Sequence, residues 1–217
     1  MNDKIFFWQV VVEHHHIYTW LEVQKKLATK PTFIVKILEN KIRKAQGWKS
    51  SNLDQIDYMQ ISEKDLKEKG KEIIKSNREA IHVFLGFRGH IKYDYFGLIV
   101  YGLKIGAKIV VLNEAYSISP TGYYGDTQPI LDRVKPLIRP LLYSWMAYVI
   151  NQTRKKHDLC IFALSILAQD QFIKAGFKSD GIYPFGYFVP KMGNIKNHNH
   201  KSSQDEIKLV YVVTWIT

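Results

Sequence analysis

Short apolar runs alternate with amphipathic stretches along most of the chain. The runs are rich in β-branched and aromatic residues and have the length of single strands, whereas the stretches between them place apolar residues at helical spacing. This alternation is typical of βα units and a parallel sheet. The predicted strands cover residues 5–12, 32–38, 56–61, 81–85, 108–112, 159–164 and 181–184. The pattern therefore predicts an α/β fold with a Rossmann-like parallel sheet flanked by helices.

Helices are predicted between these strands. They cover residues 18–28, 62–75, 93–105, 141–156 and 168–175. Ser62 has the character of an N-cap, because acidic residues follow it in the first turn. Pro136 and Pro140 are expected to kink or interrupt the helical region before residue 141.

The C-terminal part of the sequence predicts a change of domain. Residues 191–206 have too little apolar content to build a core, so we expect an interdomain linker there. The apolar run 207–213 that follows is typical of a buried parallel strand. We therefore expect an N-terminal domain in residues 1–190 and, in residues 207–217, the first strand of a second, C-terminal domain that is truncated in this sequence.

Composition narrows the class of protein. With 217 residues, of which 46% are hydrophobic and 24% charged, the chain can bury the core of one ordinary globular domain. The formal net charge of +11 favours an anionic partner, namely nucleic acid, a phospholipid surface or a phosphorylated small molecule. We expect no nucleic-acid partner, since the sequence lacks a recognition helix and an RNA-binding aromatic motif.

The single cysteine and the apolar runs bear on location. Cys160 stands in an apolar stretch and is expected to be a buried, inert thiol, and one cysteine excludes a disulfide within the chain. No apolar run reaches the ~20 residues that a membrane-spanning helix needs. We expect a cytoplasmic protein that is soluble or peripheral on the inner face of the membrane.

Ligands of parallel α/β sheets bind at the carboxyl ends of the strands, so the loops that follow the strands are candidate sites. After the first strand, Gln9 and Glu13 lead into three consecutive histidines, where a helix N-terminus would suit a phosphate or a sugar edge. At most two adjacent histidines on a helix could share a metal ion, and we expect no metal here. A solvated helix start is the alternative.

Two further loops carry candidate chemistry. Gly86 lets the backbone approach a ligand and Arg88 could hold an anion, although the G-x-G-x-x-G fingerprint is absent and a plain turn is the alternative. Glu114, with Tyr116 close by, directly follows the strand at 108–112. Its carboxylate could accept hydrogen bonds from hydroxyl groups or act as a base, whereas an N-cap or a loop salt bridge is the alternative.

Residues 133–156 combine an apolar, aromatic segment with flanking cations. The cations are Arg133, Lys135, Arg139, Arg154, Lys155 and Lys156. Such framing suits anionic lipid headgroups. A core helix with cations favourably placed at its C-terminus is the alternative, and the pattern favours it somewhat.

Several of these stretches together resemble the N-terminal half of a GT-B glycosyltransferase of the group 1 (family 4) type. The matching stretches are residues 5–9 with His15 shortly after, 82–86, 114–116 and 181–190. The resemblance implies a retaining, two-domain enzyme that moves a sugar from a nucleotide donor to an acceptor, without an obligatory metal or a further cofactor. It implies a role in cell-surface polysaccharide synthesis. It also implies an acceptor site lined by Gln9, Glu13, His15, Gly86, Arg88, Glu114 and Tyr116.

The implied partners are a glycan or lipid-linked acceptor and a donor-binding half. Since the resemblance assigns the donor contacts to the second domain, we expect no sugar transfer by this chain in isolation. Either the gene is truncated and the donor-binding half is missing, or a separate chain supplies that half. The alternative class is a non-catalytic α/β module that binds a sugar, a nucleotide or an anionic lipid.

Overall fold

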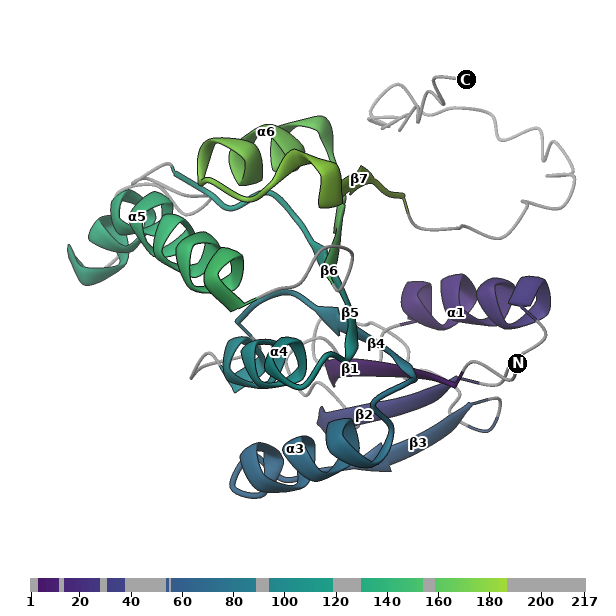
Figure 1. The fold of residues 1–217 in the computed structure, drawn as a ribbon. Coiled ribbons are helices and arrows are strands. Elements are labelled where there is room, and N and C mark those ends of the chain that lie inside the picture. The colour runs from purple at the N-terminus through teal and green to yellow at the C-terminus, as the bar shows by residue number, and fades with distance from the viewer. Residues whose placement is uncertain are drawn as a thin grey trace, which may run out of the picture.

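A parallel sheet forms the centre of the protein (Figure 1). The computed structural model describes residues 4–11, 14–27, 31–37, 54, 56–88, 94–118, 130–153 and 159–186. Seven strands in these ranges pair in the order β3-β2-β1-β4-β5-β6-β7, and every pair is parallel. They are β1 (Ile5–Val11), β2 (Thr32–Ile37), β3 (Asp57–Gln60), β4 (Ile81–Leu85), β5 (Lys108–Asn113), β6 (Leu159–Ala163) and β7 (Ile182–Pro184). The predicted α/β fold is confirmed.

The strand order reverses between β1 and β4. The chain runs outward from β1 through β2 to β3, and it then returns to pair β4 with the other side of β1. Loops on the two sides of such a reversal diverge, which opens a crevice at the carboxyl ends of the strands. Trp8 pairs with Phe84, so β1, which ends at Val11, continues beyond the level at which β4 ends at Leu85.

Helices cover both faces of the sheet. They are α1 (His14–Leu27), α3 (Leu66–Ser76), α4 (Asp94–Lys104), α5 (Ile130–Thr153) and α6 (Ile166–Lys174), with a short 3₁₀ turn at Ser179–Gly181. Figure 1 shows α1 on one side of the sheet, with α3 and α4 on the other. Because side chains alternate along a strand, Phe7 packs in the core beneath α1, whereas Phe6 and Trp8 join the larger core beneath the other helices.

Helices α1 and α3 each begin about four residues away from the predicted position. α1 starts at His14, so the three histidines lie in its first turn rather than before it. α3 starts at Leu66, and Ser62 stands outside it. The Ser62 Oγ accepts a hydrogen bond from the backbone N–H of Asp65 at 3.3 Å, so Ser62 stabilises the turn that leads into the helix.

The prediction that the longest regular helix begins only at residue 141 is wrong. α5 runs without interruption from Ile130 to Thr153, with Pro136 and Pro140 inside it. A proline within a helix costs about 3 kcal/mol through a lost hydrogen bond and a clash with the preceding turn. Pro136 is buried, and the side of α5 that contains it packs on the core through Tyr143, Met146, Ala147 and Ile150. Tertiary burial therefore outweighs the local penalty.

Three further expectations concern the C-terminal segment, the cysteine and membrane-spanning helices. The predicted linker at 191–206 and the predicted strand at 207–217 lie outside the described residues. Cys160 is half-buried in β6 rather than fully buried. Within the described ranges, none of the helices is long and apolar enough to cross a membrane.

Candidate functional site

The loops after β4 and β5 meet at the carboxyl edge of the sheet, beside the reversal of strand order. The end of β4 pairs with β5 through Leu85 and Leu112, and the end of β5 pairs with β6 through Asn113 and Ala163. The predicted site residues of these loops follow directly. Gly86, Arg88, Glu114 and Tyr116 therefore come to one edge of the sheet.

Gly86 places the loop after β4 over the end of β5. Its φ is +87°, a conformation that residues with a Cβ rarely adopt. Its backbone N–H donates a hydrogen bond of 2.7 Å to the carbonyl oxygen of Leu112. A Cβ added here would lie 3.2 Å from Oδ1 of Asn113, so glycine is required for this close approach.

Asn113, which the sequence did not single out as a site residue, joins the two loops. Its Oδ1 accepts a hydrogen bond from the backbone N–H of Phe87 at 3.2 Å, and its Nδ2 donates to the carbonyl oxygen of Glu114 at 2.7 Å. Its own carbonyl oxygen accepts from the N–H of Leu164, just after β6. An amide that ends an apolar strand is the one signal in the sequence that could have indicated this role.

The loop after β5 is also attached to two helices. Gln171 of α6 accepts from the backbone N–H of Tyr116 at 2.8 Å and donates to the carbonyl oxygen of Tyr116 at 2.9 Å. Arg139 of α5 donates from Nη1 to the carbonyl oxygen of Ser117 at 3.1 Å. The segment from Asn113 to Ser117 is therefore held by contacts from the loop after β4, from α5 and from α6.

The ring of Tyr116 is part of this arrangement. It stacks on the ring of Tyr143, with 4.4 Å between centroids and 15° between planes. Burial raises the pKa of Tyr116, and the neighbouring Tyr143 adds to the rise. The phenol of Tyr116 is therefore protonated at neutral pH and can donate a hydrogen bond.

Glu114 is exposed, although its backbone is held on both sides. Arg88 is half-buried at the same edge of the sheet, two residues beyond Gly86. A carboxylate accepts hydrogen bonds only, and a guanidinium donates only. The edge therefore offers groups that suit a ligand rich in hydroxyls with an anionic part.

The remaining predicted site residues lie in and after β1, and none of them is shown at the exposed edge of the sheet. Gln9 has no exposed surface, and it shares a strand face with Ile5 and Phe7 in the core beneath α1. His15 lies in the first turn of α1, and only its backbone is described. Glu13 lies outside the described residues. Contact of these three with a ligand stays a prediction.

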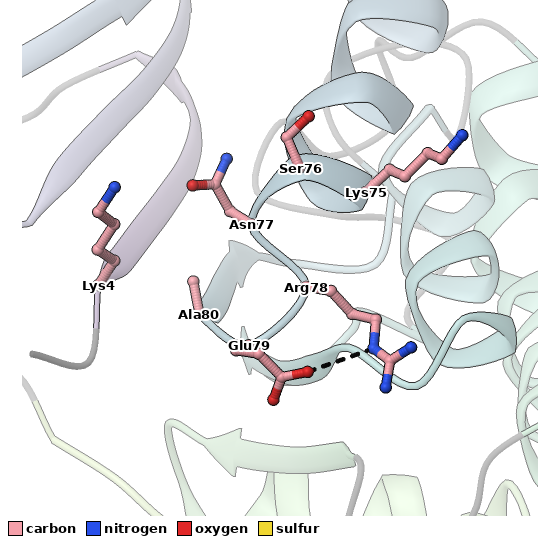
Figure 2. Close-up of a pocket in the computed structure, with 7 residues that line it drawn as sticks. All are labelled: Lys4, Lys75, Ser76, Asn77, Arg78, Glu79 and Ala80. Carbon is pink, nitrogen blue, oxygen red and sulfur yellow. Dashed lines mark ion pairs between the residues drawn. The ribbon is translucent and has the colours of Figure 1, made fainter. Parts of the chain in front are cut away.

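A hollow of about 350 Å³ lies at the opposite, amino edge of the sheet (Figure 2). Its lining comprises Lys4, Lys75, Ser76, Asn77, Arg78, Glu79 and Ala80. Lys4 precedes β1 and Ala80 precedes β4. Figure 2 shows Lys75 and Arg78 pointing away from Lys4, and Nε of Arg78 lies 3.4 Å from the Glu79 carboxylate. The charged groups do not converge on a ligand, so the carboxyl edge remains the candidate site.

In the part of the chain that the structure describes, no group of three or more His, Cys, Asp or Glu side chains is arranged to hold a metal ion.

Comparison with known proteins gives a distant likeness of fold. No protein-family model and no curated protein sequence matches this chain. Among solved structures, the crystal structure of Anabaena Alr3699/HepE in complex with UDP-glucose is 12% identical to it, with a TM-score of 0.48. The similar region covers 86% of this chain and 44% of that one. The chain thus spans less than half the length of that protein.

Proposed function

We propose that the described domain is the acceptor-binding domain of a GT-B type glycosyltransferase that moves a sugar from a nucleotide donor to a glycan or lipid-linked acceptor. The observation that carries this proposal is the exposed carboxylate of Glu114 on a loop that is held by the loop after β4, by α5 and by α6. This loop lies at the carboxyl edge, beside the reversal of strand order. The resemblance of the stretches around Gln9, Gly86 and Glu114 to such enzymes supports it.

A sugar acceptor presents hydroxyl groups, which a carboxylate binds by accepting their hydrogen bonds. Hydrogen bonds to a charged group contribute about 1.5–3 kcal/mol each, more than neutral ones do. Because the backbone around Glu114 is already ordered, little conformational entropy is lost when a ligand binds. Gly86 supports the same role, since a residue without a Cβ lets a ligand approach the backbone.

Arg88 is proposed to bind the anionic part of a lipid-linked acceptor, such as a phosphate. A guanidinium can bind a phosphate through two parallel hydrogen bonds. The formal charge of +11 favours such a ligand over a neutral one. Contacts with the donor phosphates are not assigned to any of the described residues.

The test is isothermal titration of the purified full chain with a water-soluble, short-chain analogue of a phosphate-linked acceptor sugar, and separately with nucleotide sugars. We expect the acceptor analogue to bind and Glu114→Gln to weaken its binding about tenfold, which corresponds to the loss of one charged hydrogen bond. Glu79→Gln is the matched control, because Glu79 is also exposed but lies at the amino edge.

The outcomes separate acceptor from donor binding. Acceptor binding that depends on Glu114 and not on Glu79 supports the proposal. Binding of nucleotide sugars that is lost in Glu114→Gln, with no binding of the acceptor analogue, would contradict it. Equal loss in both variants would also count against it, because the carboxyl edge would then have no special role.

A further inference from the structure

Helix α5 has two apolar faces, and only one of them packs on the core. Its buried face contains Pro136, Tyr143, Met146, Ala147 and Ile150. Six large hydrophobic residues of the same helix are exposed, and we call them the outer face: Val134, Leu137, Ile138, Leu141, Trp145 and Tyr148. At ~100° per residue these six fall within an arc of about 100° centred opposite the buried face. The exposure is therefore a property of one side of the helix.

The outer face is long and strongly exposed. Leu141 is 72% exposed and Tyr148 is 64% exposed. From Val134 to Tyr148 the face extends about 21 Å along the helix axis, at 1.5 Å per residue. Single exposed hydrophobic residues are common on soluble proteins, but a continuous stripe of this kind marks a contact surface.

The side chain of Trp145 packs against α4 while part of it stays exposed on the outer face. Its ring lies 5.1 Å from the ring of Phe96 in α4, and 53% of the residue is still exposed. Trp and Tyr are the side chains that favour the boundary between water and hydrocarbon, because each combines an apolar ring with a polar group. Trp145 and Tyr148 stand one turn apart on the outer face.

Cations outnumber acidic residues along and just after α5. Residues 130–156 contain the six cations listed above and one acidic residue, Asp132. Two copies of this helix placed face to face would bring these like charges together, which disfavours a second copy as the occupant. An anionic lipid surface attracts the same charges, by about 1 kcal/mol for each Lys or Arg near the headgroups.

We propose that the outer face of α5 docks on an anionic lipid surface, with the helix lying in the plane of the membrane interface. Figure 1 shows α5 at the margin of the domain, where such a surface can reach it. The proposal needs only the outer face and its charges, so it stands independently of the sugar site. Arg139 of the same helix contacts Ser117, and Tyr116 stacks on the buried Tyr143, so the loop of Glu114 lies on the core side of α5, with the helix between it and the lipid surface.

The test is co-sedimentation of the full chain with phosphatidylcholine vesicles, with and without phosphatidylglycerol. We expect binding to the phosphatidylglycerol vesicles and its loss in high salt, because screening weakens the electrostatic part. Leu137→Ser/Leu141→Ser is expected to lower the partition coefficient at least tenfold, because two leucine side chains no longer leave water.

Two further variants keep the test sharp. Tyr58→Ser/Met59→Ser is the matched control, because both residues are large and exposed but lie on β3, at the far end of the sheet. Arg133→Gln/Lys135→Gln leaves the apolar residues in place and is expected to weaken binding to anionic vesicles about tenfold. Thermal unfolding of every variant shows whether the fold is retained.

Each outcome decides for or against the lipid surface. Weaker binding in both α5 variants, with the β3 control unchanged, supports the proposal. Equal binding to neutral and anionic vesicles, or full binding by Leu137→Ser/Leu141→Ser, would overturn it. Self-association in solution that this variant abolishes, without vesicle binding by the parent chain, would show that a second copy occupies the face instead.

Discussion

Trp8 donates its indole N–H to Nδ1 of His82 across the β1–β4 pair, with 3.3 Å between the nitrogens. The other ring nitrogen of His82, Nε2, lies 3.0 Å from the carbonyl oxygen of Asn77. An acceptor at Nδ1 and a donor at Nε2 define the neutral ring with its proton on Nε2. Phe6 stacks on the same imidazole, with 5.3 Å between ring centroids. The two central strands are thus joined through a buried, neutral histidine.

Stability is expected to fall as the pH falls from about 6.5 to about 4. Burial lowers the pKa of His82 to about 4, against a partly opposing effect of the Asn77 carbonyl. Above pH 6.5 the ring is neutral in both the folded and the unfolded chain. Between the two pKa values only the unfolded chain takes up the proton, which lowers the free energy of unfolding by about 3 kcal/mol in total. Urea unfolding at about pH 7.5, 6, 5 and 4 measures this loss of stability.

His82→Gln identifies the residue responsible. Glutamine does not titrate, so the variant should lose less stability than the parent chain over the same pH range, although it should be less stable at pH 7 because of poorer packing. If the two chains lose the same amount of stability on acidification, other groups cause the loss and the assignment to His82 is wrong.

Gly86→Ala is expected to lower the free energy of unfolding by about 1–2 kcal/mol, since a Cβ is unfavourable at positive φ. The new Cβ would also lie 3.2 Å from Oδ1 of Asn113. Gly97→Ala in α4 is the control, because a Cβ there meets no atom within 4 Å. It should instead stabilise the helix by up to about 1 kcal/mol. Denaturant unfolding of both variants gives the comparison, and a loss of stability in both would contradict it.

Asn113→Ala is expected to reduce stability by about 1–3 kcal/mol, because the buried N–H of Phe87 loses its acceptor. It should also weaken binding of the acceptor analogue, since the backbone of Glu114 loses a contact. Asn113→Asp keeps an acceptor for Phe87 and loses the donor to Glu114. If Asn113→Ala binds the analogue as tightly as the parent chain does, Asn113 is a structural residue and does not position Glu114.

Gln171→Leu should release the loop after β5 from α6. Both backbone groups of Tyr116 lose their partner, so hydrogen exchange at the amide of Tyr116 should become about tenfold faster or more. Gln169→Leu, on the same helix, is the control and should leave this amide unchanged. Exchange measured by NMR on the folded chain reports the difference. An unchanged rate in Gln171→Leu would mean that other contacts hold the loop.

Much of the candidate site follows from sequence position. Gly86, Arg88, Glu114 and Tyr116 each come soon after an apolar run, and the carboxyl ends of parallel strands lie at one edge. Gln171 could not be found in this way, because it contacts Tyr116 across 55 positions of the chain. The burial of Gln9 was equally hidden, because the end of a strand is compatible with either burial or exposure.

The sequence by itself determined where strands and helices alternate. A short apolar run that is bounded by polar residues favours a single buried strand over other local structures. Only the tertiary structure decided three things: the strand order, the unbroken path of α5 through Pro136 and Pro140, and the side of α5 that faces the core. Each depends on contacts between segments that are distant in the sequence. A helix that is apolar on two sides can bury either one, and the packing of Tyr143 and Met146 in the core leaves Leu141 and Tyr148 exposed.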